Sequence, residues 1–529
     1  MKKQSVLSSK NKLMTFAVYL LFLIFSFGIL YICTASSPRY ATNPWNDANA
    51  FLTMGRAMSS GLTIYKDIFE QKGPLLYLLH AVASLISDSS FLGVYIIQSL
   101  FLSATAFAAY KIASLYVGTA WSVISAVLTC FVTVNSGCYY YGDSAEEFCL
   151  PLLMISIYFF CRYFRNTEQD ELSKSVFLLV GFFAGCVAMI KFTVIGFWFA
   201  WAAYILLYIW IAKKNFKKAF VNAMIFLCGM ALAVAPWIVY FAVKGALYDF
   251  INTYFVLNAT AYPRAEGLGI ISRIFEPLHS LCENLVISPA LFILGFLGII
   301  IFAATKIFTE KKLFSRLSVP FVCCIGLYII YFGIRYYNYY FIPMSVFTVF
   351  TFIALAYLLN NITKSKSGII AAILCIAIIP TAIVTSNYLN LSSRFTPRKG
   401  EETVQSKAAE YIVSRNPNGR ILNYGSLDSG IYLAAKQVPQ FKHFEQQNLL
   451  YDKYPENIDE QNRYISDGLA DYVAIAAKSG MELSDIYNKN IALKTDYTLV
   501  FSQEYIIAES AFKNKKTVQT YYLFELKED

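Results

Sequence analysis

Residues 14–33 form the uncharged stretch MTFAVYLLFLIFSFGILYIC. A helix rises about 1.5 Å per residue, so this stretch is long enough to cross the roughly 30 Å of hydrocarbon in a bilayer. Secretory signal peptides have shorter apolar segments, of up to about 15 residues, which favours a membrane span. The small residues of the following CTASS leave cleavage as the alternative.

The composition extends this interpretation to the whole chain. Of its 529 residues, 57% are hydrophobic and only 15% are charged, with 44 Phe and 39 Tyr. Soluble domains carry about 25% charged residues. The values therefore predict a polytopic membrane protein. The net charge of +10 indicates no nucleic-acid partner, because the lysines gather in short connectors between apolar stretches.

These basic connectors set the expected orientation. They are KKNFKK at 213–218, KIFTEKKLFSR at 306–316 and TKSKS at 363–367, and the amino terminus is also rich in lysine. The positive-inside rule places all of these segments in the cytoplasm. We therefore expect the outward segments to be 34–73, 135–147, 244–285, the short RYYN at 335–338 and the chain after about residue 390.

Two outward loops, 34–73 and 135–147, must be joined by an even number of crossings, yet the chain between them contains three apolar segments. The segment 74–87 is short and begins with Pro74, so we interpret it as a helix lying at the membrane interface. This interpretation gives about 11 crossings in an all-α membrane domain, with about 13 as the alternative.

From about residue 400 the sequence becomes mixed and polar. EETVQSKAAEYIVSRN has helical spacing, whereas RILNYG, DYVAIAA, YTLVFSQEYII and TYYLFEL are typical of strands. About 130 residues are enough to bury a core of their own. We predict a transmembrane domain over 1–390 and a small extracytoplasmic α/β domain over 400–529.

Cysteine and histidine patterns exclude some classes of site. The 11 cysteines lie almost entirely inside apolar stretches, and only Cys138 and Cys282 lie in outward loops, so no disulfide framework is predicted. The 3 histidines have no ligand spacing, so no zinc site is predicted. The sequence has no P-loop and no GxGxxG element between a strand and a helix.

Ionisable side chains gather on the outward side. A charge at the centre of a membrane costs about 2.5–3.5 kcal/mol, so such a cluster is a candidate for function. Lys191 lies at a tight bend between two apolar stretches, and Arg335 lies in the turn RYYNYYFIP. The whole cluster consists of Asp47, Lys72, Asp143, Glu146, Glu147, Lys191 and Arg335.

Carboxylates with separate cations suit the transfer of a sugar from a lipid-linked phosphate to a hydroxyl group. The leaving phosphate needs cations to neutralise its charge, and the hydroxyl needs one carboxylate as a base. The stretch DANAFLTMGRAM predicts an amphipathic helix with Phe51, Met54 and Met58 on one face. Such a helix would rest in the interface and hold Asp47 at the depth of a lipid phosphate.

These features resemble the GT-C superfamily of membrane glycosyltransferases, which includes protein O-mannosyltransferases and the aminoarabinose transferase of lipid A. The resemblance covers about residues 10–390 and rests on the first-loop acid, GLTIYKDIFEQKGPLLYLLH, the acidic YYYGDSAEEF and YYNYYFIP. It implies that Asp47 is the catalytic base and that Lys72 of KGPL contacts the donor phosphate. It also implies that Asp143 or Glu146 is the second-loop acid.

The remaining outward cations, Lys191 and Arg335, are assigned to the donor phosphate as well. Each assignment has a structural alternative. Lys72 and Lys191 would be lysines that snorkel at a membrane boundary, and Arg335 would belong to an interfacial aromatic belt. Asp67 and Glu70 would only orient their loop.

The carboxylates also have structural alternatives. Asp47 would cap a helix that begins at Ala48. Asp143 and Glu146 have the spacing of a capping box that opens a membrane span. No metal site is assigned, the alternative being a divalent ion held by Asp47 and Asp143 together.

The predicted function is a multi-pass membrane glycosyltransferase that moves a sugar from a polyprenyl-phosphate donor to a cell-envelope glycan or protein, without a cofactor. The rival is a transporter or flippase of lipid-linked sugars, for which repeated halves and broken helices would be typical. A non-catalytic scaffold that presents the outer domain is the third alternative. It leaves the charges of the first loop unexplained.

Overall fold

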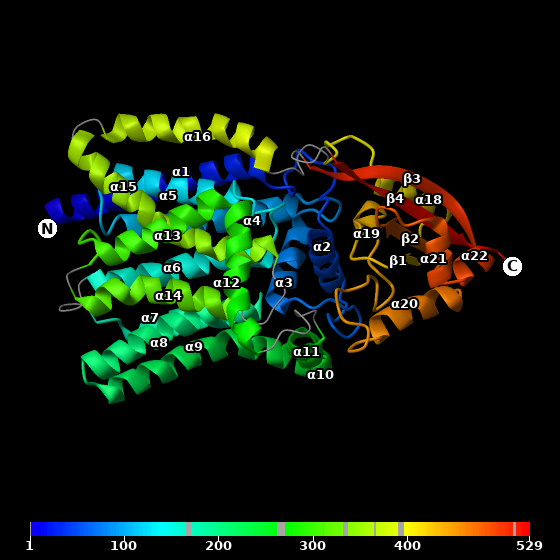
Figure 1. Cartoon of the computed structure of the whole chain (residues 1–529), viewed down its shortest axis with the longest axis horizontal. Coiled ribbons are helices and arrows are strands. Elements are labelled where there is room, and N and C mark those ends of the chain that lie inside the picture. The colour runs from blue at the N-terminus through cyan, green and yellow to red at the C-terminus, as the bar shows by residue number, and fades with distance from the viewer. Residues whose placement is uncertain are drawn as a thin grey trace. The chain divides into compact units, whose positions relative to one another are not determined.

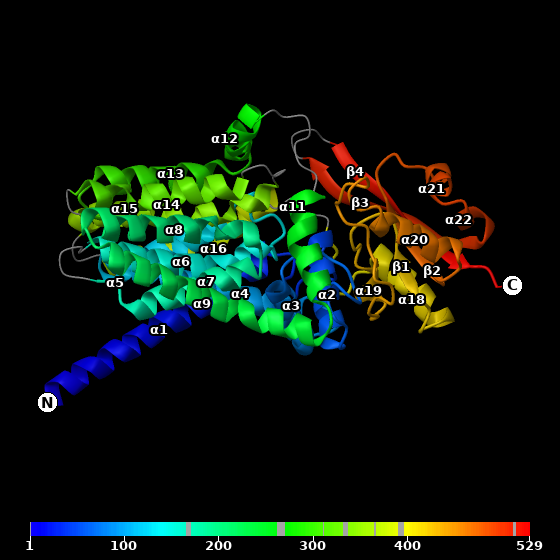
Figure 2. The ribbon, with the colours of Figure 1, turned by 90° about the horizontal axis from the view of Figure 1, so that it is seen from below.

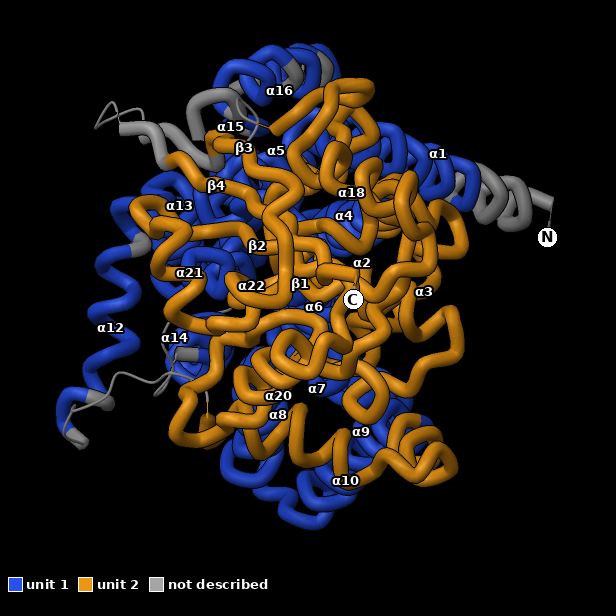
Figure 3. The backbone as a smooth tube through the Cα atoms, turned by 90° about the vertical axis from the view of Figure 1, so that its right-hand side faces the viewer, with its two compact units in different colours: residues 1–33, 98–236, 265–389 blue, residues 34–97, 237–264, 390–529 orange. Residues whose placement is uncertain are grey.

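The computed structural model describes residues 2–165, 171–261, 270–309, 312–331, 337–363, 367–389, 396–510 and 515–528. The chain forms two compact units, coloured separately in Figure 3. Unit 1 comprises Met1–Cys33, Gln98–Pro236 and Ala265–Leu389, and unit 2 comprises Thr34–Ile97, Trp237–Arg264 and Asn390–Asp529. Unit 2 therefore joins the loop after the first span to the carboxy-terminal part of the chain.

Helices make up the regular structure of unit 1 in its described residues. They are α1 (Lys2–Cys33), α4 (Leu92–Ala113), α5 (Thr119–Val134), α6 (Ala145–Arg165), α7 (Lys174–Ala188), η1 (Phe192–Ile195), α8 (Gly196–Leu207), η2 (Tyr208–Ala212), α9 (Phe216–Val243), α12 (Ile270–Ile287), α13 (Pro289–Ala304), α14 (Leu313–Tyr331), η4 (Asn338–Phe347), α15 (Thr348–Thr363) and α16 (Ser367–Leu389). The first turns of α4 and the last turns of α9 belong to unit 2.

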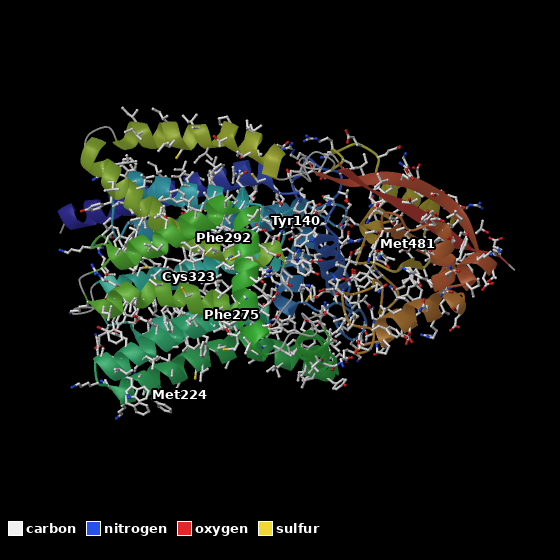
Figure 4. All side chains as sticks on the ribbon, viewed as in Figure 1. Tyr140, Met224, Phe275, Phe292, Cys323 and Met481 are labelled. Atoms are coloured by element: carbon white, nitrogen blue, oxygen red, sulfur yellow. The ribbon has the colours of Figure 1, made fainter. Side chains whose placement is uncertain are left out.

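The unit 1 helices form a bundle in which α6, α8, α13 and α14 run side by side (Figures 1 and 2). Phe292 on α13 and Cys323 on α14 are buried in it (Figure 4). The indole N–H groups of Trp198 and Trp201 on α8 donate to the Oγ (3.1 Å) and the carbonyl oxygen (2.9 Å) of Ser156 on α6. One serine thus satisfies both buried indoles, which fixes α8 against α6.

Long apolar helices identify unit 1 as membrane-spanning. Within the described residues, 8 helices are long and apolar enough to cross a membrane, or 9 if the pair α12–α13, bent by 120°, forms one span. Leu227, Leu232 and Val239 of α9 are exposed, as expected for side chains that face lipid. The predicted class, an α-helical polytopic membrane protein, is confirmed. The prediction of about 11 crossings is higher because it also counts α5 and α7, which are apolar but shorter than these helices.

The helices of unit 2 are mostly short. They are α2 (Asn46–Ser59), α3 (Pro74–Ile86), α10 (Leu247–Phe250), η3 (Ile251–Leu257), α11 (Asn258–Thr260), α18 (Val404–Arg415), α19 (Ile431–Ala434), α20 (Glu456–Ser466), α21 (Leu483–Lys489) and α22 (Ala492–Thr495). α2 and α3 cross so closely that a Cβ atom at Gly55 would lie 2.4 Å from the backbone carbon of His80. Only glycine permits this crossing.

The carboxy-terminal part of unit 2 contains a sheet of 4 strands in the order β1-β2-β4-β3. The strands are β1 (Ile421–Asn423), β2 (Tyr472–Ala477), β3 (Tyr497–Ser510) and β4 (Lys515–Leu526). β1 is parallel to β2, and the other pairs are antiparallel. The core contains Leu422, Val473, Leu493 and Phe524. The small carboxy-terminal α/β part of the predicted fold class is confirmed, and it belongs to the same compact unit as Thr34–Ile97 and Trp237–Arg264.

The beginning of the first loop pairs with the beginning of this carboxy-terminal part. Tyr40 and Arg398 form an antiparallel bridge. The N–H of Ala41 donates to the carbonyl of Pro397 (2.9 Å), and the N–H of Lys399 donates to the carbonyl of Arg39 (2.9 Å). This pairing begins the association of the first loop with the carboxy-terminal part that continues at α2.

Candidate functional site

Asp47 lies in the first turn of α2, in unit 2. The helix begins at Asn46 with Trp45 as its N-cap, and no side chain caps it. The alternative that Asp47 caps a helix beginning at Ala48 is therefore wrong. Asp47 is partly buried, and a carboxylate in the first turn interacts favourably with the helix dipole. Nothing in the start of α2 requires an acid at this position for capping.

The turn before α2 is fixed by amide side chains. The N–H of Trp45 donates to Oδ1 of Asn43 (3.0 Å). The Nδ2 of Asn49 donates to the carbonyl oxygens of Asn43 (3.0 Å) and Trp45 (3.2 Å). These bonds satisfy backbone groups at the helix start without using the carboxylate of Asp47.

Lys72 lies near the same helix. Its Nζ lies 5.5 Å from the ring centroid of Phe51 and 3.4 Å from Oε1 of Glu70. Phe51 is one helical turn after Asp47, and residues four apart on a helix share a face. The predicted base and the predicted phosphate contact therefore belong to one side of α2. The side chain of Lys72 is 18% exposed, whereas that of Glu70 is 2% exposed.

Glu70 and two tyrosines hold the backbone of Lys72. The N–H of Lys72 donates to Oε2 of Glu70 (3.0 Å) and to the hydroxyl oxygen of Tyr77 (2.8 Å). The hydroxyl of Tyr65 donates to the carbonyl of Lys72 (2.6 Å), and the hydroxyl of Tyr77 donates to Glu70. Glu70 therefore orients its loop, which was the structural alternative for this residue. It does so by accepting the backbone N–H of Lys72. Asp67 is exposed and accepts from the N–H of Thr63 (2.7 Å).

Two buried carboxylates that sequence reasoning missed come from the carboxy-terminal part. Burial raises the pKa of Asp428 to about 6, opposed by hydrogen bonds from Thr53 and the N–H of Gly430. Burial also raises the pKa of Glu445 well above its usual range, and the charges of Glu70, Asp428 and Asp47 add to this effect. The only sequence signal is that SLDSG and HFEQQ place acids within otherwise uncharged short segments.

The second-loop acids lie in unit 1, where α6 begins at Ala145. The N–H of Glu147 donates to Oγ of Ser144 (3.3 Å), so Ser144 and Glu147 occupy the positions that we predicted for Asp143 and Glu146. The predicted capping box is therefore wrong by one residue. Asp143 is buried, with a left-handed backbone at φ +66.

Glu147 anchors the turn that precedes α6. Its Oε2 accepts from the N–H of Asp143 (2.8 Å) and from Nε2 of Gln98 (3.0 Å), and its Oε1 accepts from the hydroxyl of Tyr139 (2.6 Å). Burial, followed by the charge of Glu147, raises the pKa of the Tyr139 hydroxyl well above its usual range. The exposed Tyr140 follows, and Figure 4 labels it. Glu147 thus has a positional role.

Glu146 forms a buried ion pair with Lys191, the residue before η1. The Nζ of Lys191 also lies 3.4 Å from the ring centroid of Tyr340 and 5.5 Å from that of Tyr339, both in η4. The second carboxylate oxygen of Glu146, Oε2, has no hydrogen-bond partner among the described residues. The structure therefore brings the predicted residues Glu146 and Lys191 together.

The predicted site residues thus fall into two groups, one in each unit. Asp47 and Lys72 belong to unit 2, and Asp143, Glu146 and Lys191 belong to unit 1. Arg335 lies outside the described residues. In the described part of the chain, no group of three or more His, Cys, Asp and Glu side chains is placed to hold a metal ion.

Solved structures of known proteins share this fold. ArnT from Cupriavidus metallidurans in the apo state is similar with a TM-score of 0.57 and 11% identity over 97% of this chain and 98% of that chain. The structure of its complex with undecaprenyl phosphate is similar with a TM-score of 0.55 and 10% identity, over the same shares of the two chains. The archaeal oligosaccharyltransferase AglB from Archaeoglobus fulgidus, in complex with an inhibitory peptide and a dolichol-phosphate, is similar with a TM-score of 0.56 and 13% identity. This similarity covers 96% of this chain and 74% of that chain. The fold is GT-C-like, as the sequence resemblance predicts.

A comparison with curated proteins finds no sequence match. A protein-family model does match residues 8–385, and its description is "Putative competence-induced protein Ccs4 N-terminal domain". This match covers more than half of the 529 residues. The chain therefore belongs to the competence-induced Ccs4 N-terminal domain family.

Proposed function

We propose that this protein is a membrane glycosyltransferase that moves a sugar from a polyprenyl-phosphate donor to a hydroxyl acceptor. The observation that carries the proposal is that the Nζ of Lys72 lies 5.5 Å from the ring centroid of Phe51, which is one helical turn after Asp47 on α2. A carboxylate and a partly exposed ammonium group are the two charges that this reaction needs.

The reaction requires little from the protein besides these charges. The acceptor oxygen bonds to the anomeric carbon of the sugar while the bond from that carbon to the phosphate oxygen breaks. In the proposed mechanism Asp47 takes the hydroxyl proton, and the polyprenyl phosphate leaves with the electron pair. Lys72 compensates the charge that develops on the phosphate. Glu70 and Tyr77 hold Lys72 for this role.

Two fold relatives support a lipid-phosphate ligand. ArnT binds undecaprenyl phosphate in one structure, and the AglB complex contains a dolichol-phosphate. Both are GT-C glycosyltransferases. Their identity to this chain is 10% and 13%, so the donor lipid is part of the proposal. An envelope glycan or a protein on the outer face of the membrane is the proposed acceptor.

The predicted site residues of unit 1 are secondary in this proposal. The free carboxylate oxygen of Glu146 is an acceptor for a hydroxyl donor, and Asp143 is the neighbouring second-loop acid. Lys191 and Arg335 stay predicted contacts of the donor phosphate. The ion pair with Glu146 means that a phosphate would have to compete for Lys191. Lys72 is therefore the primary phosphate contact in the proposal.

Two experiments test the function. Mass spectrometry of the lipid-linked sugars and envelope glycans of cells with and without the gene identifies the donor, which should accumulate in its absence. The purified protein in liposomes should then release polyprenyl phosphate from the labelled donor and transfer its sugar. If instead the intact donor crosses the vesicle membrane without bond cleavage, the protein is a flippase and the proposal is wrong.

A further inference from the structure

One face of α2 is polar and buried. Asn49, Thr53 and Arg56 follow the spacing i, i+4 and i+7, which places them along one side of the helix. All three side chains are buried. Burying polar groups is unfavourable unless each finds a hydrogen-bond partner. Their partners therefore indicate what this face of the helix is built to contact.

The hydrogen-bond partners of Thr53 and Arg56 come from one segment of the carboxy-terminal part of unit 2. The hydroxyl of Thr53 donates to Oδ2 of Asp428 (2.7 Å). The Nη1 of Arg56 donates to the carbonyl oxygens of Tyr432 (3.1 Å) and Gln437 (2.9 Å). These contacts join residues that are more than 370 positions apart in the sequence.

The third residue of this face, Asn49, meets the same segment at Gly430. A Cβ atom at Gly430 would lie 3.3 Å from Oδ1 of Asn49, and Gly430 has φ +92. Both the close approach and the left-handed backbone favour glycine here. The N–H of Gly430 donates to Oδ1 of Asp428 (2.8 Å), so the turn that approaches Asn49 also orients the acceptor of Thr53.

The same segment also holds the loop that carries Lys72. The N–H of Phe69 donates to the carbonyl of Lys442 (2.9 Å). The Phe69 ring lies 5.0 Å from the ring of His443 and stacks at 5.2 Å on that of Tyr454. Phe69 directly precedes Glu70, whose carboxylate accepts from the N–H of Lys72.

Internal hydrogen bonds make residues 428–445 one connected piece. The N–H of Asp428 donates to Oε2 of Glu445 (2.6 Å), and the hydroxyl of Tyr432 donates to the carbonyl of Phe444 (2.8 Å). The Nδ2 of Asn457 on α20 donates to the carbonyl of Glu445 (3.0 Å). The contacts to α2, and the contacts that Lys442 and His443 make with Phe69, therefore come from the same connected segment.

We propose that residues 428–445 are a positioning segment that sets Asp47 and Lys72 relative to each other. Thr53 and Arg56 fix the rotation of the helix that carries Asp47, and Phe69 fixes the loop that carries Lys72. This inference rests on the proposed function. It makes the carboxy-terminal part of the chain a component of the transfer site, and Asp428 and Phe69 are positioning residues that need not touch the substrate.

The two contacts predict different kinetic effects. Thr53→Val removes the hydroxyl at nearly constant volume and leaves a buried carboxylate oxygen of Asp428 without its donor. We expect kcat to fall about 10- to 100-fold, the cost of a misplaced catalytic group, with less than about a twofold change in the donor KM. Phe69→Leu should instead raise the donor KM about 10-fold, because it displaces the loop of Lys72.

Conservative and distant variants are the controls. Thr53→Ser keeps the hydroxyl and should retain kcat. Asp459→Asn changes an exposed acid of α20 and should leave both constants unchanged. A merely structural role for Thr53 would lower the amount of folded protein but leave kcat per folded molecule unchanged. Equal kcat values for Thr53→Val and Thr53→Ser would overturn the inference.

Hydrogen exchange separates this inference from the proposed function. Amides of α2 should exchange faster in the full-length Thr53→Val protein than in Thr53→Ser, whether or not any sugar is transferred. If the wild type transfers no sugar but α2 responds in this way, the proposed function is wrong and the positioning of α2 stands. If α2 exchanges equally in both variants, the positioning segment is excluded.

Discussion

Lys191 and Glu146 form a buried ion pair, and the ammonium group of Lys191 lies 3.4 Å from the ring centroid of Tyr340. The pair joins α6 to the residue before η1, and the tyrosine joins both to η4. Because the carboxylate and the aromatic face both stabilise the cation, we expect Lys191 and Glu146 to behave as one unit in mutagenesis.

Breaking the pair from one side should be costly. Lys191→Met or Glu146→Gln leaves an uncompensated buried charge, for which about 3–5 kcal/mol is typical. The double variant removes both charges and should recover most of the loss. Thermal denaturation in detergent, compared among the four proteins, measures this. A double variant whose loss of stability equals the sum of the two single losses would show that the two residues act independently.

Asp47→Asn tests the proposed base. The amide cannot accept the hydroxyl proton, so turnover should fall by about 10²–10⁴, and the amount of folded protein should not change because asparagine keeps the size of Asp47 and the N-cap of α2 is Trp45. Asp67→Asn is the matched control, since Asp67 is exposed and accepts the N–H of Thr63 within its own loop. Sugar transferred per mole of folded protein at saturating donor is the measurement. Normal turnover in Asp47→Asn removes the assignment.

Lys72→Ala should weaken donor binding. A charge-assisted contact contributes about 1.5–3 kcal/mol, which corresponds to an increase of roughly 10- to 150-fold in the donor KM. Lys72→Arg should restore part of this affinity because the positive charge is retained. Initial rates over a range of donor concentrations give the KM. If neither substitution alters it, Lys72 is a boundary lysine.

The raised pKa of Asp428 should make the stability of the protein depend on pH. Its folded-state pKa is about 6 because of burial, against about 3.9 in an unfolded chain. Between these values the folded state binds more protons, so the free energy of unfolding falls as pH rises from about 4 to about 6. Asp428→Asn removes this loss, which is on the order of 2–3 kcal/mol. The stabilities of the wild type and the variant should therefore diverge in favour of the variant as pH rises.

The difference between the two proteins is the informative quantity. The buried Glu445 contributes with the same sign, whereas the pKa of His443 is lowered to about 4, mainly by burial, and gives the opposite slope. Both groups are present in wild type and variant alike. Chemical denaturation at pH 4.5 and pH 7, at about 25 °C, measures the difference. A difference independent of pH contradicts the role of burial at Asp428.

Gly55→Ala should destabilise unit 2. The added Cβ would lie 2.4 Å from the backbone of His80, so α2 and α3 must separate. Overpacking of this kind costs about 1–3 kcal/mol. Gly28→Ala is the control, because nothing lies within 4 Å of its Cβ position, and alanine is the better helix former there. Thermal denaturation should show a loss only for Gly55→Ala.

The sequence predicted the class and many of the elements. Apolar stretches predicted the helices, and DYVAIAA and TYYLFEL predicted β2 and β4, because both signals are local. The helix at 47–58 was also predicted. Its polar face was not, because Thr53 and Arg56 are satisfied by Asp428, Tyr432 and Gln437, which no local pattern connects to them.

The prediction of site residues also succeeded where the signal is local and failed where it depends on residues distant in the sequence. Asp47 and Lys72 were predicted because they stand out as charges beside apolar stretches, and the structure places the Nζ of Lys72 5.5 Å from the ring of Phe51, one helical turn after Asp47. Asp428 and Glu445 were missed because an acid in a mixed, polar segment is usually a solvated surface residue. Their burial depends on the packing of the whole of unit 2. The cap of α6 was predicted one residue too early, at Asp143 instead of Ser144. The two residues are adjacent and both Asp and Ser are good N-caps, so the sequence does not distinguish them.

The left-handed backbone of Asp143 has a consequence for the history of this position. Only Gly, Asn and Asp adopt such a conformation readily, and other residues cost about 1–2 kcal/mol. Selection for the backbone alone would let relatives drift among these three residues. Selection for the carboxylate would keep Asp. The variation at this position among relatives therefore records which of the two properties selection has preserved.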